Sequence, residues 1–139
     1  FSSIFLNVIP GGKIKMGPLW DFDLAFGNVN YSECEYPTGF CVKDHKWFAR
    51  FFEDQSFVSK VKSRFIYFKN NQQLILDKMD VYAEQLKYSQ LENDDVWGTI
   101  GNYVWPNPVV FGTYQEEVRH LKSWYSERMT WLENEFNNM

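Results

Sequence analysis

The sequence has 139 residues, of which 45% are hydrophobic and 19% aromatic, and a formal net charge of −4 at pH 7. This length predicts a single domain over residues 1–139 with one hydrophobic core. The acidic balance disfavours nucleic acid as a partner, because a polyanion is bound by a basic surface. No apolar run approaches the roughly 20 residues that cross a bilayer, so no transmembrane segment is predicted.

The first predicted element is an antiparallel β-hairpin. Residues 1–9 are rich in β-branched and aromatic side chains, and residues 13–16 alternate between polar and apolar. Pro10 and Gly11 between them suit the central positions of a type II turn. The pair Gly17-Pro18 then ends strand pairing and redirects the chain.

Two aspartates, Asp21 and Asp23, follow the hairpin in the segment GPLWDFDLAFGN at residues 17–28. A strand end that turns at Asp21 brings both carboxylates toward one cation. Mg²⁺ is held in proteins by few carboxylates and keeps positions for water and phosphate oxygens. A solvated turn accommodates the same pair, because Asp is common in turns, and the spacing alone leaves both interpretations open.

The next segment is a predicted loop over residues 31–42 that carries Cys34 and Cys41. Pro37 and Gly39 lie between them, so the loop can fold back and bring their Cα atoms to the roughly 5.5 Å of a disulfide. Two unpaired thiols fit the spacing equally well. A zinc site is disfavoured, because too few further Cys or His ligands lie nearby.

Three helices are predicted next from capping residues and apolar periodicity. The first runs from a cap at Asp44 to about Asp54, the second begins at a cap at Ser56, and the third spans Gln72 to about Leu91. The second helix carries four cations that a solvated face explains better than a phosphate site does: Lys60, Lys62, Arg64 and Lys69.

A packed irregular loop is predicted over residues 98–112, where Gly and Pro recur too often for regular structure. We expect Asp94 and Asp95 just before it to be solvated rather than to act as ligands. A last helix of about 23 residues follows a capping box that begins at Thr113. Arg128 lies beside its apolar stripe and is expected to pair with a buried acid or with carbonyls, because an unpaired charge there is costly.

Together these elements predict an α+β fold. An antiparallel hairpin with the D-x-D motif (residues 1–28) packs on a mainly helical part (residues 44–139) of about four helices. The sequence contains neither a G-x-S-x-G nucleophile motif nor a Walker-type glycine loop, which leaves hydrolase chemistry without support. A glycosyltransferase that uses D-x-D needs an α/β nucleotide-sugar domain, and these elements do not form one.

The segment GPLWDFDLAFGN resembles the diagnostic segment of the CotH kinase family, the spore-coat-protein-H type of atypical, secreted protein kinase. The similarity continues through WFARFFEDQSFVSKVKSRF (47–65) and TYQEEVRHLKSWYSERMTWLENEF (113–136). The resemblance implies part of a protein-kinase-like fold that transfers a phosphoryl group from ATP to a hydroxyl of a protein substrate.

The resemblance also implies roles for individual residues. Asp21 corresponds to the aspartate that holds Mg²⁺, or Mn²⁺, against the phosphates of ATP, and Asp23 supports it. Ser3 falls where the family places a short polar residue after its catalytic aspartate, and it is either a further metal ligand or a hydroxyl on a strand edge. Because members of the family are typically secreted, the resemblance favours a disulfide between Cys34 and Cys41.

In the family's pattern the catalytic aspartate lies a few residues before Phe1, and the nucleotide-binding lobe lies further upstream. We therefore expect the chain to be the C-terminal portion of a CotH-like kinase domain, inactive alone and partnered by its own N-terminal lobe. The family further implies secretion or a place on the cell surface, in the bacterial envelope or the spore coat. The rival hypothesis is a non-catalytic surface, adhesion or structural module that keeps the fold.

Overall fold

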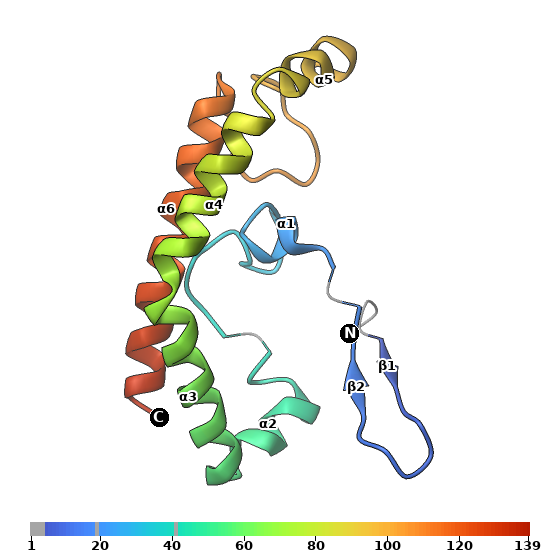
Figure 1. Cartoon of the computed structure of the whole chain (residues 1–139), viewed down its shortest axis with the longest axis vertical. Helices are drawn as coiled ribbons and strands as arrows, with labels where there is room; N and C mark the ends of the chain where they lie inside the picture. Colours follow the sequence, from blue (N-terminus) through green and yellow to red (C-terminus); the bar gives the residue numbers. More distant parts are fainter. Residues whose placement is uncertain (1–4, 19, 41) are drawn as a thin grey trace.

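The computed structural model describes residues 5–18, 20–40 and 42–139. In this part of the chain a two-stranded antiparallel sheet is followed by six helices, so the predicted α+β class is confirmed. Figure 1 shows α3 and α4 running end to end beside the long helix α6, with α1 and α2 to one side and the hairpin apart from them. Two more helices are present than the sequence predicted.

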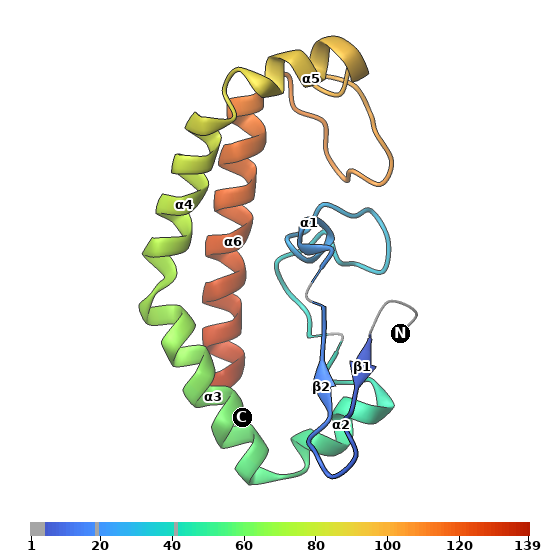
Figure 2. The same ribbon diagram turned by 45° about the vertical axis from the view of Figure 1, so that its right-hand side comes forward.

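The hairpin forms as expected. Strand β1 (Leu6–Asn7) pairs with β2 (Lys15–Met16), with Leu6 opposite Met16. The amide of Gly12 donates to the carbonyl of Ile9 at 2.8 Å, and Gly11 has a φ of 75°, as a type II turn requires. Residues 5–16 are all exposed, however, so the expected packing of the hairpin on the helices is not found. The hairpin overlaps α2 in the view of Figure 2, but Figure 1 shows the two apart.

Helices α2 (Lys46–Phe52) and α3 (Gln55–Asn70) begin at other caps than Asp44 and Ser56. His45 caps α2, where its Nδ1 accepts a hydrogen bond from the amide of Trp47. Asp54 caps α3 by accepting from the amide of Ser56 at 2.8 Å and from the Ser56 hydroxyl at 3.0 Å. Both predicted caps were wrong by one or two residues, because neighbouring polar residues compete for the same free amides.

The predicted helix over residues 72–91 is divided into α4 (Gln72–Gln85) and α5 (Ser89–Trp97). Gly98 ends α5 with a φ of 58°, the left-handed conformation common after a helix end. Asp94 Oδ1 accepts from the Ile100 amide at 2.7 Å and from the Thr99 hydroxyl, so this carboxylate closes the helix end and is not solvated as expected. Asp95 is exposed, as predicted.

Residues 98–112 contain no helix or strand, as predicted, and lead into α6 (Tyr114–Asn137). Thr113 caps α6, because its Oγ1 accepts from the Glu116 amide at 3.2 Å. The Thr113 hydroxyl also donates to Glu116 Oε2 at 2.9 Å, so the glutamate contacts the cap's side chain instead of its backbone. The predicted start of this helix is therefore confirmed.

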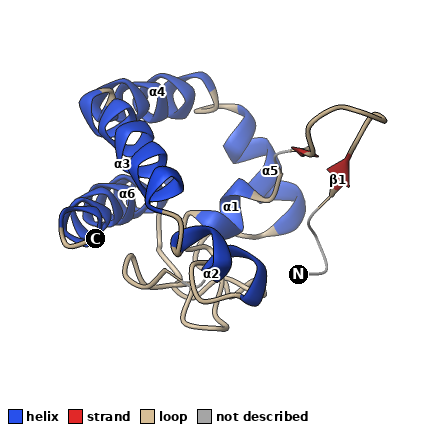
Figure 3. Cartoon of the chain, turned by 90° about the horizontal axis from the view of Figure 1, so that it is seen from below, coloured by secondary structure: helices blue, strands red, loops and turns tan. Residues whose placement is uncertain are grey.

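The core of the described chain lies between α3 and α6, where Phe65 packs with Tyr125, Met129 and Phe136. Burial raises the pKa of the Tyr125 hydroxyl. Figure 3 shows α3, α4 and α6 as neighbours, with the hairpin at the margin. Helix α6 is thus the element against which the others are arranged.

The loop after α1 is tied to α6 by two side chains of that helix. Trp124 Nε1 donates to the Glu35 carbonyl at 2.7 Å. Arg128 donates to the carbonyls of Pro37 at 3.1 Å and Gly39 at 2.6 Å, which confirms the expected pairing of this cation with carbonyls. These bonds fix the position of the segment that carries the acidic motif.

Candidate functional site

Asp21 lies immediately before α1 (Phe22–Ala25), at a backbone position that few residues adopt. Its φ of 56° and ψ of 39° are left-handed, a conformation in which Asp and Asn are enriched among non-glycine residues. The Asp21 carbonyl accepts from the Ala25 amide at 3.1 Å, whereas its side chain makes no capping bond. The side chain is exposed and makes no ion pair with any described residue, so its carboxylate is open to a cation.

Asp23 lies in the first turn of the same short helix. Its carbonyl accepts from the amides of Phe26 and Asn28, each at 3.2 Å, which bends the chain back after α1. Asp23 lines an apolar pocket between the helices, and Asp21 does not. The structure therefore places both predicted ligands on one turn but gives only Asp23 a place in the pocket.

The corner formed by residues 21–28 is anchored on α6 through Phe26 and Gly27. The Phe26 ring stacks on Tyr125 with centroids 5.7 Å apart. Gly27 is buried, with a φ of 87°, and a Cβ added there would lie 2.6 Å from Cε2 and 2.8 Å from Cδ1 of Trp124. The predicted bend at Gly27 thus also allows a close approach between backbone and indole.

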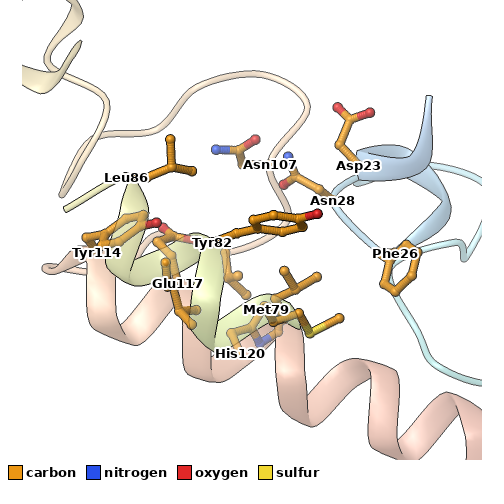
Figure 4. Close-up of a pocket in the computed structure, with 14 residues that line it drawn as sticks. Asp23, Phe26, Asn28, Met79, Tyr82, Leu86, Asn107, Tyr114, Glu117 and His120 are labelled. Atoms are coloured by element: carbon orange, nitrogen blue, oxygen red, sulfur yellow. The ribbon is translucent and has the colours of Figure 1, made fainter. Parts of the chain in front are cut away.

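The pocket beside Asp23 has a volume of about 390 Å³ and lies between α1, α4, α6 and the loop 98–112. Figure 4 shows Asp23 and Asn28 on one side of it, Asn107 from the loop, and Tyr82 in the middle. Its apolar lining residues are Phe26, Met79, Ala83, Leu86, Val109, Val118 and Leu121, and its more polar ones are Asp23, Asn28, Tyr82, Asn107, Tyr114, Glu117 and His120.

The loop 98–112 is held near the corner by two contacts with the segment after α1. Asn30 Nδ2 donates to the Tyr103 hydroxyl at 2.9 Å. The ring of Tyr31 stacks on Trp105, with centroids 6.3 Å apart. Among the described residues, Trp105 therefore stacks on a ring of the loop after α1 and not on the helices, and it remains 69% exposed.

Sequence reasoning missed the helical side of this pocket. Tyr114, Glu117 and His120 recur every three residues and so share one face of α6. That spacing is visible in the sequence, but the apolar residues of this helix alone were used to predict its packing. The contribution of Tyr82 from α4 had no local signal, because it depends on how α4 packs against α6.

The residues of the corner suit a hard divalent cation. Among the described residues, no group of three or more His, Cys, Asp and Glu side chains is placed to hold a metal. Mg²⁺ does not require such a group, because it is commonly bound by one or two carboxylates together with water and substrate phosphates. Asp21 and Asp23 could supply these two carboxylates.

Three other predicted features have different outcomes. Ser3 and Cys41 lie outside the described residues, so a metal contact of Ser3 and a disulfide of Cys41 remain predictions. The Cys34 thiol donates to the Ser32 carbonyl at 3.4 Å. Of the four cations of α3, Lys60 and Arg64 are exposed, whereas Lys62 and Lys69 are half-buried. Arg64 lies over the ring of Tyr67, and Lys69 pairs with Glu133 at 2.9 Å.

The fold and the corner define a class, an α+β domain with two neighbouring carboxylates suited to a hard cation. Residues 7–132 match the family model described as CotH kinase protein. The chain therefore belongs to the CotH kinase family. Searches among curated proteins and among solved structures found no match. In the described chain, no helix combines the length and the apolar character needed to cross a membrane.

Proposed function

We propose that this chain provides the metal-binding part of a kinase that transfers a phosphoryl group from ATP to a protein hydroxyl. The observation that carries the proposal is the open carboxylate of Asp21, held at a left-handed position next to a second aspartate. Membership of the CotH kinase family supports the same chemistry. The proposal includes the expectation that the chain is the C-terminal portion of the kinase domain.

In this proposal Asp21 is the main ligand of Mg²⁺ and Asp23 supports it. The bound ion would offset negative charge on the ATP phosphates during transfer. The Asp21 side chain makes no capping hydrogen bond at the start of α1, so no such bond has to break when a cation binds. Phe26 and Gly27 hold this turn against α6 and thereby limit its movement.

Metal binding can be tested on the chain itself with Mn²⁺ as a paramagnetic probe. Asp21→Asn keeps a residue that tolerates a positive φ but removes the charge. We expect it to weaken Mn²⁺ binding about tenfold or more, as measured by water-proton relaxation. Asp95→Asn removes one exposed charge from α5 and is the matched control. Equal affinities in the two variants would remove Asp21 from the metal site.

Phosphoryl transfer requires the longest natural form of the protein, incubated with Mg²⁺ and γ-labelled ATP. We expect incorporation of label into protein and a loss of about 100-fold or more in Asp21→Asn, because charge stabilisation dominates this chemistry. Circular dichroism checks that the variant stays folded. Full activity in the folded variant would contradict the proposed role of Asp21.

A second candidate function is a non-catalytic surface module. The observation that favours it is the exposed apolar hairpin, in which Ile9 is 67% and Ile14 is 70% exposed. This candidate predicts neither label incorporation nor an effect of Asp21→Asn on Mn²⁺ binding.

We also propose that the protein acts outside the cytoplasm, on the cell surface or in the spore coat, with Cys34 and Cys41 joined. Disulfides persist in oxidising compartments and are rare in the cytosol. Mass spectrometry of the natural protein, alkylated without reductant, should recover these two cysteines in one linked peptide. Recovery of both as alkylated thiols would contradict the pairing.

A further inference from the structure

The pocket between α1, α4, α6 and the loop 98–112 contains an acid, Glu117, that has no part in the proposed phosphoryl transfer. None of its 14 lining residues is Lys or Arg, whereas Asp23 and Glu117 are acids. Two carboxylates in a mainly apolar lining give the interior a negative potential. An anionic ligand without a metal ion finds no opposite charge there.

Glu117 and Asp23 are the two acids of the pocket, and neither makes an ion pair with a described residue. Three other acids of α4 and α6 do have a cation within ion-pair distance: Asp80 with Lys122, Glu84 with Lys87, and Glu116 with Arg119. Glu117 makes no ion pair and no side-chain hydrogen bond with any described residue, although it is partly buried. Its carboxylate oxygens remain accessible, so a cationic ligand can pair with them without breaking an internal bond.

The rest of the lining suits an aromatic or aliphatic body. The ring of Tyr82 crosses the pocket between the acids, with Met79 and Leu86 from the same helix beside it (Figure 4). The ammonium of Lys78 lies 5.9 Å from the centroid of this ring, at the outer limit of a cation–π contact. Neither the amide of Asn107 nor that of Asn28 makes a side-chain hydrogen bond with a described residue, so both can serve a ligand.

We infer that this pocket binds a small organic cation, a protonated amine on a body about one ring in size. The ammonium contacts Glu117, and the apolar body lies along Tyr82 toward Asp23. The volume of about 390 Å³ falls within the range of small-molecule sites. This inference does not rest on the proposed kinase function, because neither Asp21 nor a metal ion takes part in it.

The test uses fluorine NMR with two probes of the same shape and opposite charge. One is 4-fluorophenethylamine, and the other is 3-(4-fluorophenyl)propionate. We expect the amine to bind with a dissociation constant of about 1 mM or tighter, as for a fragment of this size. The propionate should bind at least about tenfold more weakly, because its charge opposes that of the pocket.

Three variants locate the binding. Glu117→Gln keeps the shape of the side chain and should weaken amine binding about tenfold. Glu127→Gln removes an exposed charge from the same helix, outside the pocket, and should leave the affinity within about twofold. Ala83→Phe fills the pocket from α4 and should abolish binding of the amine. Thermal melts confirm that each variant is folded.

Each contrary result overturns the inference. Equal binding of the two probes means that only apolar contact is involved. Equal losses in Glu117→Gln and Glu127→Gln mean that the cation is attracted by general surface charge. No response of wild-type protein to the amine up to about 10 mM means that the pocket is not a cation site. Since Asp21→Asn should not change amine affinity, failure here is distinguishable from failure of the proposed kinase function.

Discussion

Gly27 and Trp124 meet where the acidic corner rests on α6. Both Gly27 and Gly39 have positive φ values, of 87° and 84°, in the same half of the chain. An added Cβ would meet the Trp124 indole at position 27 and nothing within 4 Å at position 39. A comparison of substitutions at the two glycines therefore separates the effect of backbone strain from that of steric overlap.

We expect Gly27→Ala to lower the free energy of unfolding by about 2–4 kcal/mol, since strain of about 1 kcal/mol adds to overpacking against Trp124. Gly39→Ala should cost only about 1 kcal/mol. Urea denaturation followed by tryptophan fluorescence measures both. Equal losses would mean that Trp124 moves aside at little cost.

Asp54 gives a pH-dependent prediction. Its carboxyl pKa lies below the ordinary value of 3.8, because the amide and then the hydroxyl of Ser56 donate to it. A carboxyl with a lowered folded-state pKa binds fewer protons in the folded protein, so its contribution to stability is present above pH 3.8 and is lost as the pH falls below that value.

Asp54→Asn keeps a good capping residue that does not titrate. We expect the wild type to melt at a higher temperature than this variant at pH 7, and the difference to shrink as the pH falls below 3.8. Ser56→Ala removes the hydroxyl but keeps the amide, so it should retain a smaller dependence on pH. A difference that stays constant from pH 7 to about pH 3 would contradict the ionised cap.

At the scale of elements, α6 holds the loop after α1 through Arg128. This guanidinium donates to two carbonyls and lies 4.9 Å from the ring centroid of Trp131. We expect Arg128→Met to lower the free energy of unfolding by about 1.5–3 kcal/mol and to speed amide exchange in the loop. Stability falls because the variant loses both hydrogen bonds that the guanidinium donates to the loop.

Arg119→Met is the matched control on the same helix. The Arg119 side chain is 73% exposed and lies 3.9 Å from Glu116, so its removal should change stability by less than about 0.5 kcal/mol. If the two variants lost equal stability, the hydrogen bonds of Arg128 to the two carbonyls would not contribute measurably to the free energy of unfolding.

The elements were largely predictable from sequence, and their ends were less so. The hairpin turn, the loop 98–112 and the cap at Thr113 follow from local chemistry, and each was predicted. The caps at His45 and Asp54 were missed, because several adjacent polar residues can accept from the same amides. The break between α4 and α5 was missed because the apolar pattern continues through residues 86–88.

In the candidate site, too, the residues of a local motif were predicted and those brought together by packing were not. Asp21 and Asp23 form a local motif, and the structure places both at α1. Glu117 and Tyr82 come from helices far away in sequence. Only the packing of α4 against α6 brings them to the pocket, and no spacing within one segment specifies that packing.

At the scale of the whole molecule, the hairpin and the helical part contribute differently to stability. Ile9 is 67% exposed and Ile14 is 70% exposed, whereas Met129 is 5% exposed. The double variant Ile9→Ser/Ile14→Ser should change the free energy of unfolding by less than about 0.5 kcal/mol, and Met129→Ala should lower it by about 2–5 kcal/mol.

Sedimentation velocity should also show less self-association in the double serine variant, because Ile9 and Ile14 are exposed apolar residues between β1 and β2 and such residues favour association. If the double variant were as unstable as Met129→Ala, the hairpin would have to pack on the helices in solution. Met129→Ala thus calibrates how much a buried side chain contributes in this molecule.

The left-handed backbone at Asp21 limits which residues can occupy this position without strain. Among residues with a side chain, mainly Asp and Asn adopt this pair of dihedral angles, and glycine adopts it freely because it has no Cβ. Replacing Asp21 by asparagine would therefore remove one of the two negative charges of this corner without rebuilding the turn. One conservative substitution thus separates this corner from one of the same shape with Asp23 as its remaining carboxylate.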